Sequence, residues 1–326
     1  MESVLVTGAN GFIGSHLSCD LANRGFMVYG FSRSNKSKNP EFESLVSQGK
    51  IKMILGEIQN YDTTKLPKVD YIFHLAGKVS VWGKLDEFLK INLDGTKNLL
   101  NFAKETNAKC FTYLSSVAVY GFYGYKNLPE EGEKKPFKNP YSLSKLATEN
   151  FVKDFAEKNK IDYVVVRPGN VYGEYDYTSS DEIYTRVKRK KMMTSAGGKY
   201  ESCFVYVKNL VEAIILTALK KEAHNTDYNV SDSNATLKDY LQKVAKAYNV
   251  APKFTNFPAP LAKTAACLVE FVYKLFRIKK APKITRFTVW QNCADYSFST
   301  KKLEKIGYKK VYGEDEAIER TAKYFS

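Results

Sequence analysis

The sequence predicts an α/β protein with a doubly wound parallel sheet, followed by a smaller, mostly helical region. Three observations predict it. Short apolar runs alternate with amphipathic stretches through residues 1–168, a glycine-rich loop joins the first run to the first stretch, and residues 169–326 are more irregular and more helical. Repeated β-α-β units form a parallel sheet with helices on both faces. We expect one domain at 1–168 and a second region at 169–326, interleaved with the last strands of the sheet.

Six apolar runs predict the strands, because parallel strands buried on both faces are apolar along most of their length. They are Val4–Thr7, Met27–Ser32, Ile51–Leu55, Tyr71–Leu75, Cys110–Ser115 and Tyr163–Arg167. Amphipathic stretches between them predict helices at Phe12–Arg24, Lys84–Glu105 and Pro140–Lys158. The polar segment Phe122–Asn139, rich in Lys, Glu, Gly and Pro, predicts a surface loop.

The second region shows four further helical patterns. They are Asn209–Lys220, Thr236–Tyr248, Pro260–Phe276 and Asp315–Tyr324. The third has a broad apolar stripe and is followed by Arg277, Lys279 and Lys280. Such a stripe fits docking on the domain core, an apolar substrate entrance, or a peripheral membrane contact in which the cations touch anionic headgroups. The sequence leaves these three interpretations open.

Composition narrows the class of protein. Of 326 residues, 44% are hydrophobic and 26% charged, which is typical of a globular chain. Five scattered cysteines without CxxC spacing argue against a disulfide framework or zinc site and favour a cytoplasmic location. The three histidines are too scattered for a metal site, so we expect no metal. The net charge of +15 suits anionic ligands or solubility, and with no nucleic-acid-binding motif beside it we expect no nucleic acid.

The glycine loop indicates a Rossmann dinucleotide-binding domain. Gly8, Gly11 and Gly14 lie between the first predicted strand and the first predicted helix. Glycine allows a tight turn and a close backbone approach to a pyrophosphate, and the helix N-terminus offers free N–H groups to the negative charge. The spacing is GxxGxxG. Its context between strand and helix makes the assignment specific.

The end of the second strand bears on the choice of dinucleotide. NAD binders place an acidic residue there to hold the ribose hydroxyls. Here the strand ends in Ser32 and Arg33, and no acid follows before Glu41. Because a guanidinium binds phosphate well, these residues favour the 2′-phosphate of NADP. The alternative is that they are solvated loop residues and NAD binds.

Tyr141 and Lys145 indicate acid–base chemistry. They lie four residues apart in a predicted helix, hence on one face. An ammonium beside a phenol favours the phenolate, so we expect Lys145 to lower the pKa of Tyr141. Tyr141 then exchanges a proton with a carbonyl or alcohol oxygen. Ser115 and Ser116 follow an apolar strand, at the sheet edge where ligands bind, and can hold the same oxygen.

Six motifs together resemble the extended short-chain dehydrogenase/reductase family, also known as the NAD-dependent epimerase/dehydratase superfamily. They are TGANGFIG at 7–14, HLAG at 74–77, INLDGTKNLL at 91–100, SSVAVYG at 115–121, PYSLSK at 140–145 and RPGNVYG at 167–173. The resemblance covers nearly the whole chain. It implies that Ser116, Tyr141 and Lys145 form the catalytic triad. It also implies a homodimer that pairs through Lys84–Glu105 and Pro140–Lys158.

The resemblance implies cofactor contacts from many strand ends. They are Gly8, Asn10, Gly11, Phe12, Ile13, Gly14, Ser32, Arg33, Glu57, Ile58, Leu75, Ala76, Gly77, Asn92, Ser115, Tyr141, Lys145, Pro168, Gly169 and Val171. Glu57 departs from the family, which commonly has Asp near the adenine. The substrate contacts implied are Ser80, Trp82, Ser116 and Asn170.

Residues 79–100 resemble a stretch found in 3β-hydroxysteroid dehydrogenases and dihydroflavonol reductases, and the run from Pro260 resembles the sterol and 3-oxoalkanoate dehydrogenase branch. These resemblances, with Ser32 and Arg33, lead us to expect an NADP(H)-dependent oxidoreductase. It would interconvert a ketone and a secondary alcohol on an apolar or mixed small molecule, such as a steroid, flavonoid or 3-oxo lipid. The alternative is an NAD-dependent sugar-nucleotide epimerase or dehydratase. A non-catalytic, dinucleotide-sensing protein is a third interpretation, disfavoured because Tyr141 and Lys145 are both present.

Overall fold

The computed structural model describes residues 1–326, and its main layer is a seven-stranded sheet in the order β11-β7-β5-β4-β1-β2-β3. The strands are β1 (Ser3–Thr7), β2 (Met27–Ser32), β3 (Ile51–Leu55), β4 (Tyr71–His74), β5 (Cys110–Leu114), β7 (Tyr163–Pro168) and β11 (Thr226–Val230). Every neighbouring pair is parallel. The predicted Rossmann fold is confirmed, with each predicted strand in place to within one residue at either end.

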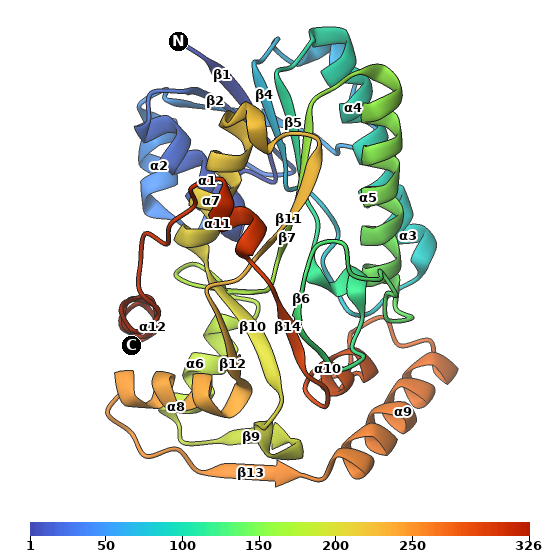
Figure 1. Cartoon of the computed structure of the whole chain (residues 1–326), viewed down its shortest axis with the longest axis vertical. Helices are drawn as coiled ribbons and strands as arrows, with labels where there is room; N and C mark the ends of the chain where they lie inside the picture. The colour runs from blue at the N-terminus through green and yellow to red at the C-terminus, as the bar shows by residue number, and fades with distance from the viewer.

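Helices cover both faces of this sheet (Figure 1). One face carries α1 (Phe12–Asn23), α2 (Pro40–Ser47) and α7 (Val207–Leu219), and the other carries α4 (Gly95–Thr106) and α5 (Pro140–Asn159). The short helix α3 (Leu85–Leu89) and the π turn η2 (Lys90–Asp94) run directly into α4, so the predicted helix at 84–105 is continuous.

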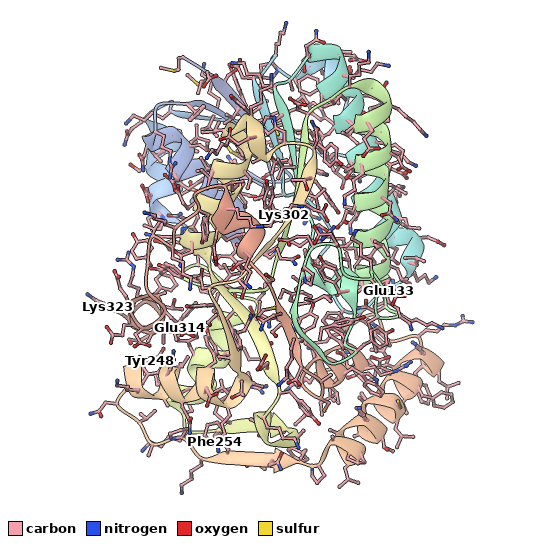
Figure 2. All side chains as sticks on the ribbon, in the orientation of Figure 1. Glu133, Tyr248, Phe254, Lys302, Glu314 and Lys323 are labelled. Carbon is pink, nitrogen blue, oxygen red and sulfur yellow. The ribbon has the colours of Figure 1, made fainter.

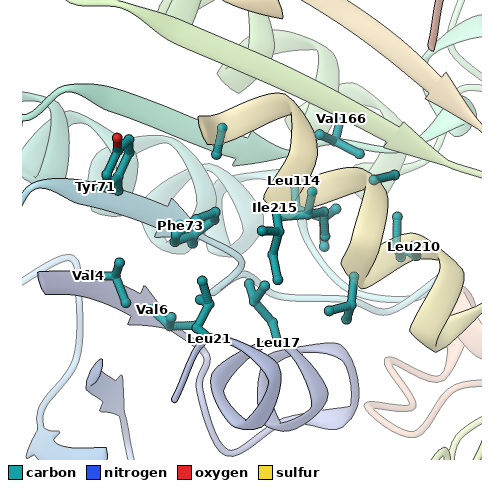
Figure 3. Packing of buried hydrophobic residues seen from close by; sticks show 14 of the residues in the cluster. Val4, Val6, Leu17, Leu21, Tyr71, Phe73, Leu114, Val166, Leu210 and Ile215 are labelled. Carbon is teal, nitrogen blue, oxygen red and sulfur yellow. The ribbon is translucent and has the colours of Figure 1, made fainter. Parts of the chain in front are cut away.

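Strand β1 shows why the apolar runs form central strands. Val4 and Val6 point into one core, beside Leu17 of α1 (Figure 3), whereas Leu5 points into the core on the opposite face. Successive side chains of a strand alternate between faces, so a strand covered by helices on both sides needs apolar residues throughout. All three of these β1 residues are fully buried.

The order of the strands locates the ligand crevice. The chain passes from β1 outward to β2 and β3, and then returns to β4 on the other side of β1. In open α/β sheets, ligands bind beyond the carboxyl ends of the strands where the order reverses in this way. The crevice is therefore expected beyond the ends of β1 and β4.

The second region contains more strands than the sequence indicated. A second sheet has the order β12-β10-β14-β6, with β8 beside β10, and a third pairs β13 with β9. The strands are β6 (Tyr125–Leu128), β8 (Asn170–Tyr172), β9 (Met192–Ser195), β10 (Glu201–Tyr206), β12 (Ser233–Thr236), β13 (Phe254–Phe257) and β14 (Tyr296–Phe298). The interpretation of Phe122–Asn139 as a simple surface loop is wrong, because it contains β6 and the buried Glu130. These strands are short, and each is paired with a strand that lies far from it in the sequence.

All four helices predicted for the second region are present. Two of them are α8 (Leu237–Ala247) and α9 (Ala259–Leu275), and the others are α7 and α12 (Glu314–Tyr324). Three shorter helices were not predicted: α6 (Ser180–Lys188), α10 (Arg286–Gln291) and α11 (Lys301–Lys305). Phe254 on β13 and Tyr248 after α8 lie in the lower part of the molecule, away from the seven-stranded sheet (Figure 2). None of the helices has both the length and the apolar character that a membrane crossing requires.

Candidate active site

A cleft of about 900 Å³ lies beyond the carboxyl ends of the parallel strands, where the strand order reverses. Nearly all of the predicted cofactor and catalytic residues line it. They are Gly8, Asn10, Gly11, Phe12, Ile13, Gly14, Ser32, Arg33, Glu57, Ile58, Leu75, Ala76, Gly77, Ser115, Ser116, Tyr141, Lys145, Pro168, Gly169 and Val171. The predicted substrate residue Ser80 lines it too, whereas Asn92, Trp82 and Asn170 do not.

The glycine loop is shaped by contacts that a side chain would prevent. Gly8 has a φ of +71°, and a Cβ there would lie 3.1 Å from the amide nitrogen of Ala76. A Cβ on Gly14 would lie 2.0 Å from the carbonyl oxygen of Gly8. Helix α1 therefore packs directly on the loop, and Gly11, its N-cap, opens the helix N-terminus at the cleft. This cradle fits the pyrophosphate of a dinucleotide.

Asn10 holds the loop that follows β2. The Arg33 side chain in that loop stays without a carboxylate partner. The backbone N–H of Asn10 donates to Ser32 Oγ (3.3 Å), and its side-chain Nδ2 donates to the carbonyl oxygen of Ser34 (2.8 Å). Ser32 is buried. Arg33, by contrast, is exposed on the cleft wall and has no carboxylate partner. Of the two residues that favoured NADP, Arg33 is the one whose charge is available to a ligand.

His74 ties the ends of β1 and β4 to α4. Thr96 donates its hydroxyl proton to the carbonyl oxygen of Asn92, so its oxygen must accept from His74 Nε2 (2.8 Å). His74 Nδ1 then accepts from the hydroxyl of Thr7 (2.8 Å), which itself accepts from the Ala76 N–H. Burial, with a smaller contribution from the Lys145 charge, lowers the pKa of His74 to about 3. The ring is neutral and structural.

Asn92 does not line the cleft, and its predicted contact with the cofactor stays a prediction. It is buried in the π turn, where Oδ1 accepts from the Lys78 N–H (2.6 Å) and Nδ2 donates to Ser144 Oγ (2.9 Å). Both ends of the amide are therefore used. The side chain fixes the segment after β4 against α5, and a Cβ on Gly77 would lie 3.1 Å from its oxygen.

Helix α5 brings Tyr141 and Lys145 to the cleft. Pro140 stands in its first turn, and the N-cap Asn139 accepts from the Ser142 N–H (3.0 Å). Lys145 Nζ donates to the carbonyl oxygen of Leu114, the last residue of β5 (2.8 Å). That bond holds the Lys145 ammonium at the wall of the cleft, one helical turn after Tyr141.

The pKa shifts differ from the sequence-based expectation. Burial raises the pKa of Tyr141, and a hydrogen bond with Ser116 opposes that rise without cancelling it. Burial also lowers the pKa of Lys145 to about 8, against the pull of Glu149. The pKa of Tyr141 is therefore raised rather than lowered in this structure, because desolvation of the buried phenol is the larger effect. The phenol is held as a proton donor.

A buried ionic network lies behind Ser115 and Ser116. The Arg167 side chain is fully buried, and its Nε and Nη2 donate to the two carboxylate oxygens of Glu149 (3.0 and 2.6 Å). Ser115 Oγ donates to the same carboxylate (2.9 Å), and Asp227 of β11 also pairs with Arg167. The network joins β5, α5, β7 and β11 at the floor of the site. Sequence analysis identified Arg167 only as the first residue of the RPGNVYG motif and predicted no role for it.

Two of the expected substrate contacts are engaged elsewhere. Trp82 Nε1 donates to the carbonyl oxygen of Ile278 (3.0 Å), beyond the end of α9. Asn170 donates from Nδ2 to Ser202 Oγ (2.9 Å) and accepts at Oδ1 from Gln291 (2.9 Å). Neither side chain lines the cleft in this structure, and their contact with substrate stays a prediction. Each residue instead joins the first half of the chain to the second region.

Other lining residues escaped the sequence analysis. They include Phe31, Gly56, Gln59, Lys78, Val79, Ile91, Leu114, Asp176, Thr178 and Ser179. The Asp176 carboxylate accepts from the hydroxyls of Thr178 and Ser179 and from the backbone N–H of Ser180 (2.8 Å). Such short-range bonds are typical of an Asx turn, and the sequence Asp-Tyr-Thr-Ser-Ser was the one local signal for it. Its place at the cleft depends on tertiary packing.

The chain matches known proteins along most of its length. The model of the NAD dependent epimerase/dehydratase family matches residues 4–231. Human dTDP-D-glucose 4,6-dehydratase is 30% identical over 273 residues, which cover 78% of this chain and 77% of the relative. The 2-alkyl-3-oxoalkanoate reductase of Shewanella oneidensis is 25% identical over 98% of this chain and 85% of its own.

A solved structure shows the same fold. The UDP-glucuronic acid 4-epimerase of Bacillus cereus, in complex with NAD, superposes with a TM-score of 0.79 at 20% identity, covering 99% of this chain and 98% of its own. The extended short-chain dehydrogenase/reductase resemblance is thereby confirmed. On the family match over residues 4–231, the chain belongs to the NAD dependent epimerase/dehydratase family.

Proposed function

We propose that this protein uses a nicotinamide dinucleotide to oxidise and re-reduce a single carbinol carbon of a sugar nucleotide, as an epimerase does. The observation that carries the proposal is the meeting of Tyr141, Ser116 and Lys145 on one cleft with the glycine cradle. A nicotinamide ring bound there would supply the hydride acceptor and donor. Gly8, Gly14 and the N-terminus of α1 would hold its pyrophosphate.

Tyr141, Ser116 and Lys145 have separate roles in the transfer of the proton. Tyr141 exchanges a proton between its Oη and the substrate oxygen, and the raised pKa of its phenol suits donation to a developing alkoxide. The Ser116 hydroxyl lines the same cleft as Tyr141 and orients that oxygen. Lys145, with a pKa of about 8, stays mostly charged at neutral pH and stabilises the tyrosinate left after donation.

The acids of the cleft favour epimerisation over dehydration. Loss of water from a sugar needs a second acid or base near the reacting carbons, besides the tyrosine. The residues that follow Ser116 are the buried Val117 and Ala118. The cleft has two carboxylates, Glu57 after β3 and Asp176, and the oxygens of Asp176 already accept several bonds. Redox exchange at one carbon needs only the groups that are present.

A second candidate is the reductase expected from the sequence, an NADP(H)-dependent ketone reductase acting on an apolar or mixed substrate. It is favoured by the unpaired Arg33 on the cleft wall and by the similarity to a 2-alkyl-3-oxoalkanoate reductase. The two candidates differ in how the dinucleotide is used. An epimerase keeps it and regenerates it in each cycle, whereas a reductase must exchange it.

The deciding experiment identifies the dinucleotide. The purified protein is denatured, the released cofactor is identified by chromatography, and the stripped protein is titrated with NAD(H) and NADP(H). Retained NAD without net turnover supports the epimerase. Exchangeable NADPH supports the reductase, and Arg33→Asp should then lower NADPH affinity while the exposed Arg189→Asp control leaves it unchanged. If Tyr141→Phe keeps the cellular function intact, the protein is a dinucleotide sensor and both candidates are wrong.

A further inference from the structure

Helix α9 is attached to the protein by its small residues. Ala262 and Ala266 are buried against Val289 and Cys293 of the α10 segment. Glu270 is also buried, and its Oε1 accepts from the Arg286 N–H (2.6 Å). The helix lies on the outside of the molecule, at the end away from the N-terminus (Figure 1). Docking on the core, one of the interpretations of the sequence, does not account for its leucines and phenylalanines.

The large apolar side chains of α9 form a stripe on the opposite face. Its members are between 44% and 70% exposed: Leu261, Leu268, Phe271, Val272, Leu275 and Phe276. Their spacings of three, four and seven residues put them on one side of the helix. Single exposed apolar residues are ordinary, but a contiguous patch marks a surface that binds something. We call this set the apolar stripe.

Cations follow the apolar stripe at its C-terminal end, whereas Lys263 and Lys274 lie on the attached side of the helix, near Trp290 and Glu270. Residues 259–284 contain six basic side chains: Lys263, Lys274, Arg277, Lys279, Lys280 and Lys283. The segment has one acid, Glu270, which is buried. An apolar helix face with basic flanks matches a bilayer surface, whose acyl chains take the apolar groups and whose anionic headgroups attract the cations.

We propose that α9 rests in the plane of an anionic membrane surface, with the apolar stripe toward the acyl chains. A second copy of this chain is a poorer occupant, because it carries the same net charge of +15 and does not supply the opposite charge. A lipid surface supplies the opposite charge. The proposal goes beyond the reaction and does not depend on which substrate is used.

The membrane contact would lie beside the cleft. Trp82 joins the two, because its Nε1 bonds the carbonyl oxygen of Ile278 and its ring packs edge-on against Tyr273 of α9, at 6.0 Å between ring centroids. Trp82 closely follows Val79 and Ser80, which line the cleft. Val79 itself is highly exposed. A substrate attached to lipid would therefore meet the cleft mouth at the same surface.

Cosedimentation of the full-length protein with vesicles tests the proposal. We expect binding to vesicles of equimolar phosphatidylcholine and phosphatidylglycerol, weaker binding to phosphatidylcholine alone, and a loss with added salt. The Leu268→Ser/Phe271→Ser variant changes only exposed positions and should bind at least about tenfold more weakly. Val311→Ser removes an apolar side chain exposed elsewhere and should bind as the wild type does. Unchanged dinucleotide binding shows that the variants are folded.

Charge reversal tests the second half of the argument. Lys279→Glu/Lys280→Glu should lose the preference for phosphatidylglycerol, whereas Lys50→Glu/Lys52→Glu, exposed on another surface, should keep it. The two tryptophans of the chain, Trp82 and Trp290, both contact α9, so their emission should change when vesicles bind. The proposal is overturned if the wild type does not bind vesicles or the apolar variant binds them unchanged. It is also overturned if the stripe instead mediates self-association or captures an acidic protein.

Discussion

Acidification from pH 7 to pH 5 should destabilise the fold through His74, and the structure gives the size of the effect. The folded ring is neutral because burial lowers its pKa from 6.5 to about 3. In the unfolded chain the ring takes up a proton as the pH falls below 6.5, so the unfolded state binds more protons between these two values. The stability contributed by His74 is fully present above pH 6.5 and declines as the pH falls toward 3. Between pH 7 and pH 5 this amounts to about 2 kcal/mol.

The assay compares the wild type with His74→Asn by urea unfolding at both pH values. The variant loses part of the bonding to Thr7 and Thr96, so we expect it to be about 1–3 kcal/mol less stable at pH 7. It has no titratable group at this position, so the gap should narrow by about 2 kcal/mol at pH 5. Other titrating groups, such as Asp232 with its raised pKa of about 6, are common to both proteins and cancel in the difference.

A gap of the same size at both pH values would refute the reasoning. It would mean that His74 is protonated in the folded protein. The assigned chain of bonds would then be wrong, because a protonated ring cannot accept a proton at Nδ1 from Thr7. A gap that widens at pH 5 would mean that the charged ring is stabilised by a partner the structure does not show.

Two other perturbations follow from particular distances. Gly14→Ala places a Cβ 2.0 Å from a backbone carbonyl oxygen, so we expect dinucleotide affinity to fall by at least about tenfold in a fluorescence titration. Gly313→Ala meets no atom within 4 Å and serves as the control. Arg167→Met removes the guanidinium that bonds both oxygens of the buried Glu149 and leaves it only the more distant Lys134 and Lys153 at 3.7 Å, so it should cost about 3 kcal/mol in urea unfolding. Arg24→Met, which breaks a partly exposed pair, should cost under about 1 kcal/mol, and equal losses would contradict the assigned roles.

The parallel sheet could be predicted because its physical demands appear in local sequence. A strand covered on both faces must be apolar along most of its length, as Val4–Val6 is, and the loop after it must be glycine where backbones touch. The strands of the second region carry no such signature. The residues of β12, Ser-Asn-Ala-Thr, are polar or small and become a strand through pairing with Glu201–Phe204 of β10. That partner lies some thirty residues earlier in the chain, so no local pattern announces it.

Helix α9 shows a different limit. Its apolar stripe was visible in the sequence, but periodicity does not say which face is attached to the protein. Alanine and leucine stripes run along the same helix on opposite sides. The structure shows that the alanines are inside, because Ala262 and Ala266 let α9 approach the α10 segment closely. The helix is therefore docked through its alanines, and the large apolar side chains are on the exposed face.

The motifs of this family mix two kinds of residue that sequence comparison cannot separate. Ser116 and Tyr141 line the cleft, whereas Asn92 and Arg167 sit in the same motifs with their polar atoms fully engaged inside the protein. A buried polar side chain must be hydrogen-bonded, so its identity is fixed as strictly as that of a group which touches a ligand. Both kinds of residue therefore appear in the sequence motifs. Only burial and the direction of each hydrogen bond show that Asn92 and Arg167 hold the walls of the site, while Tyr141 and Ser116 face the space between them.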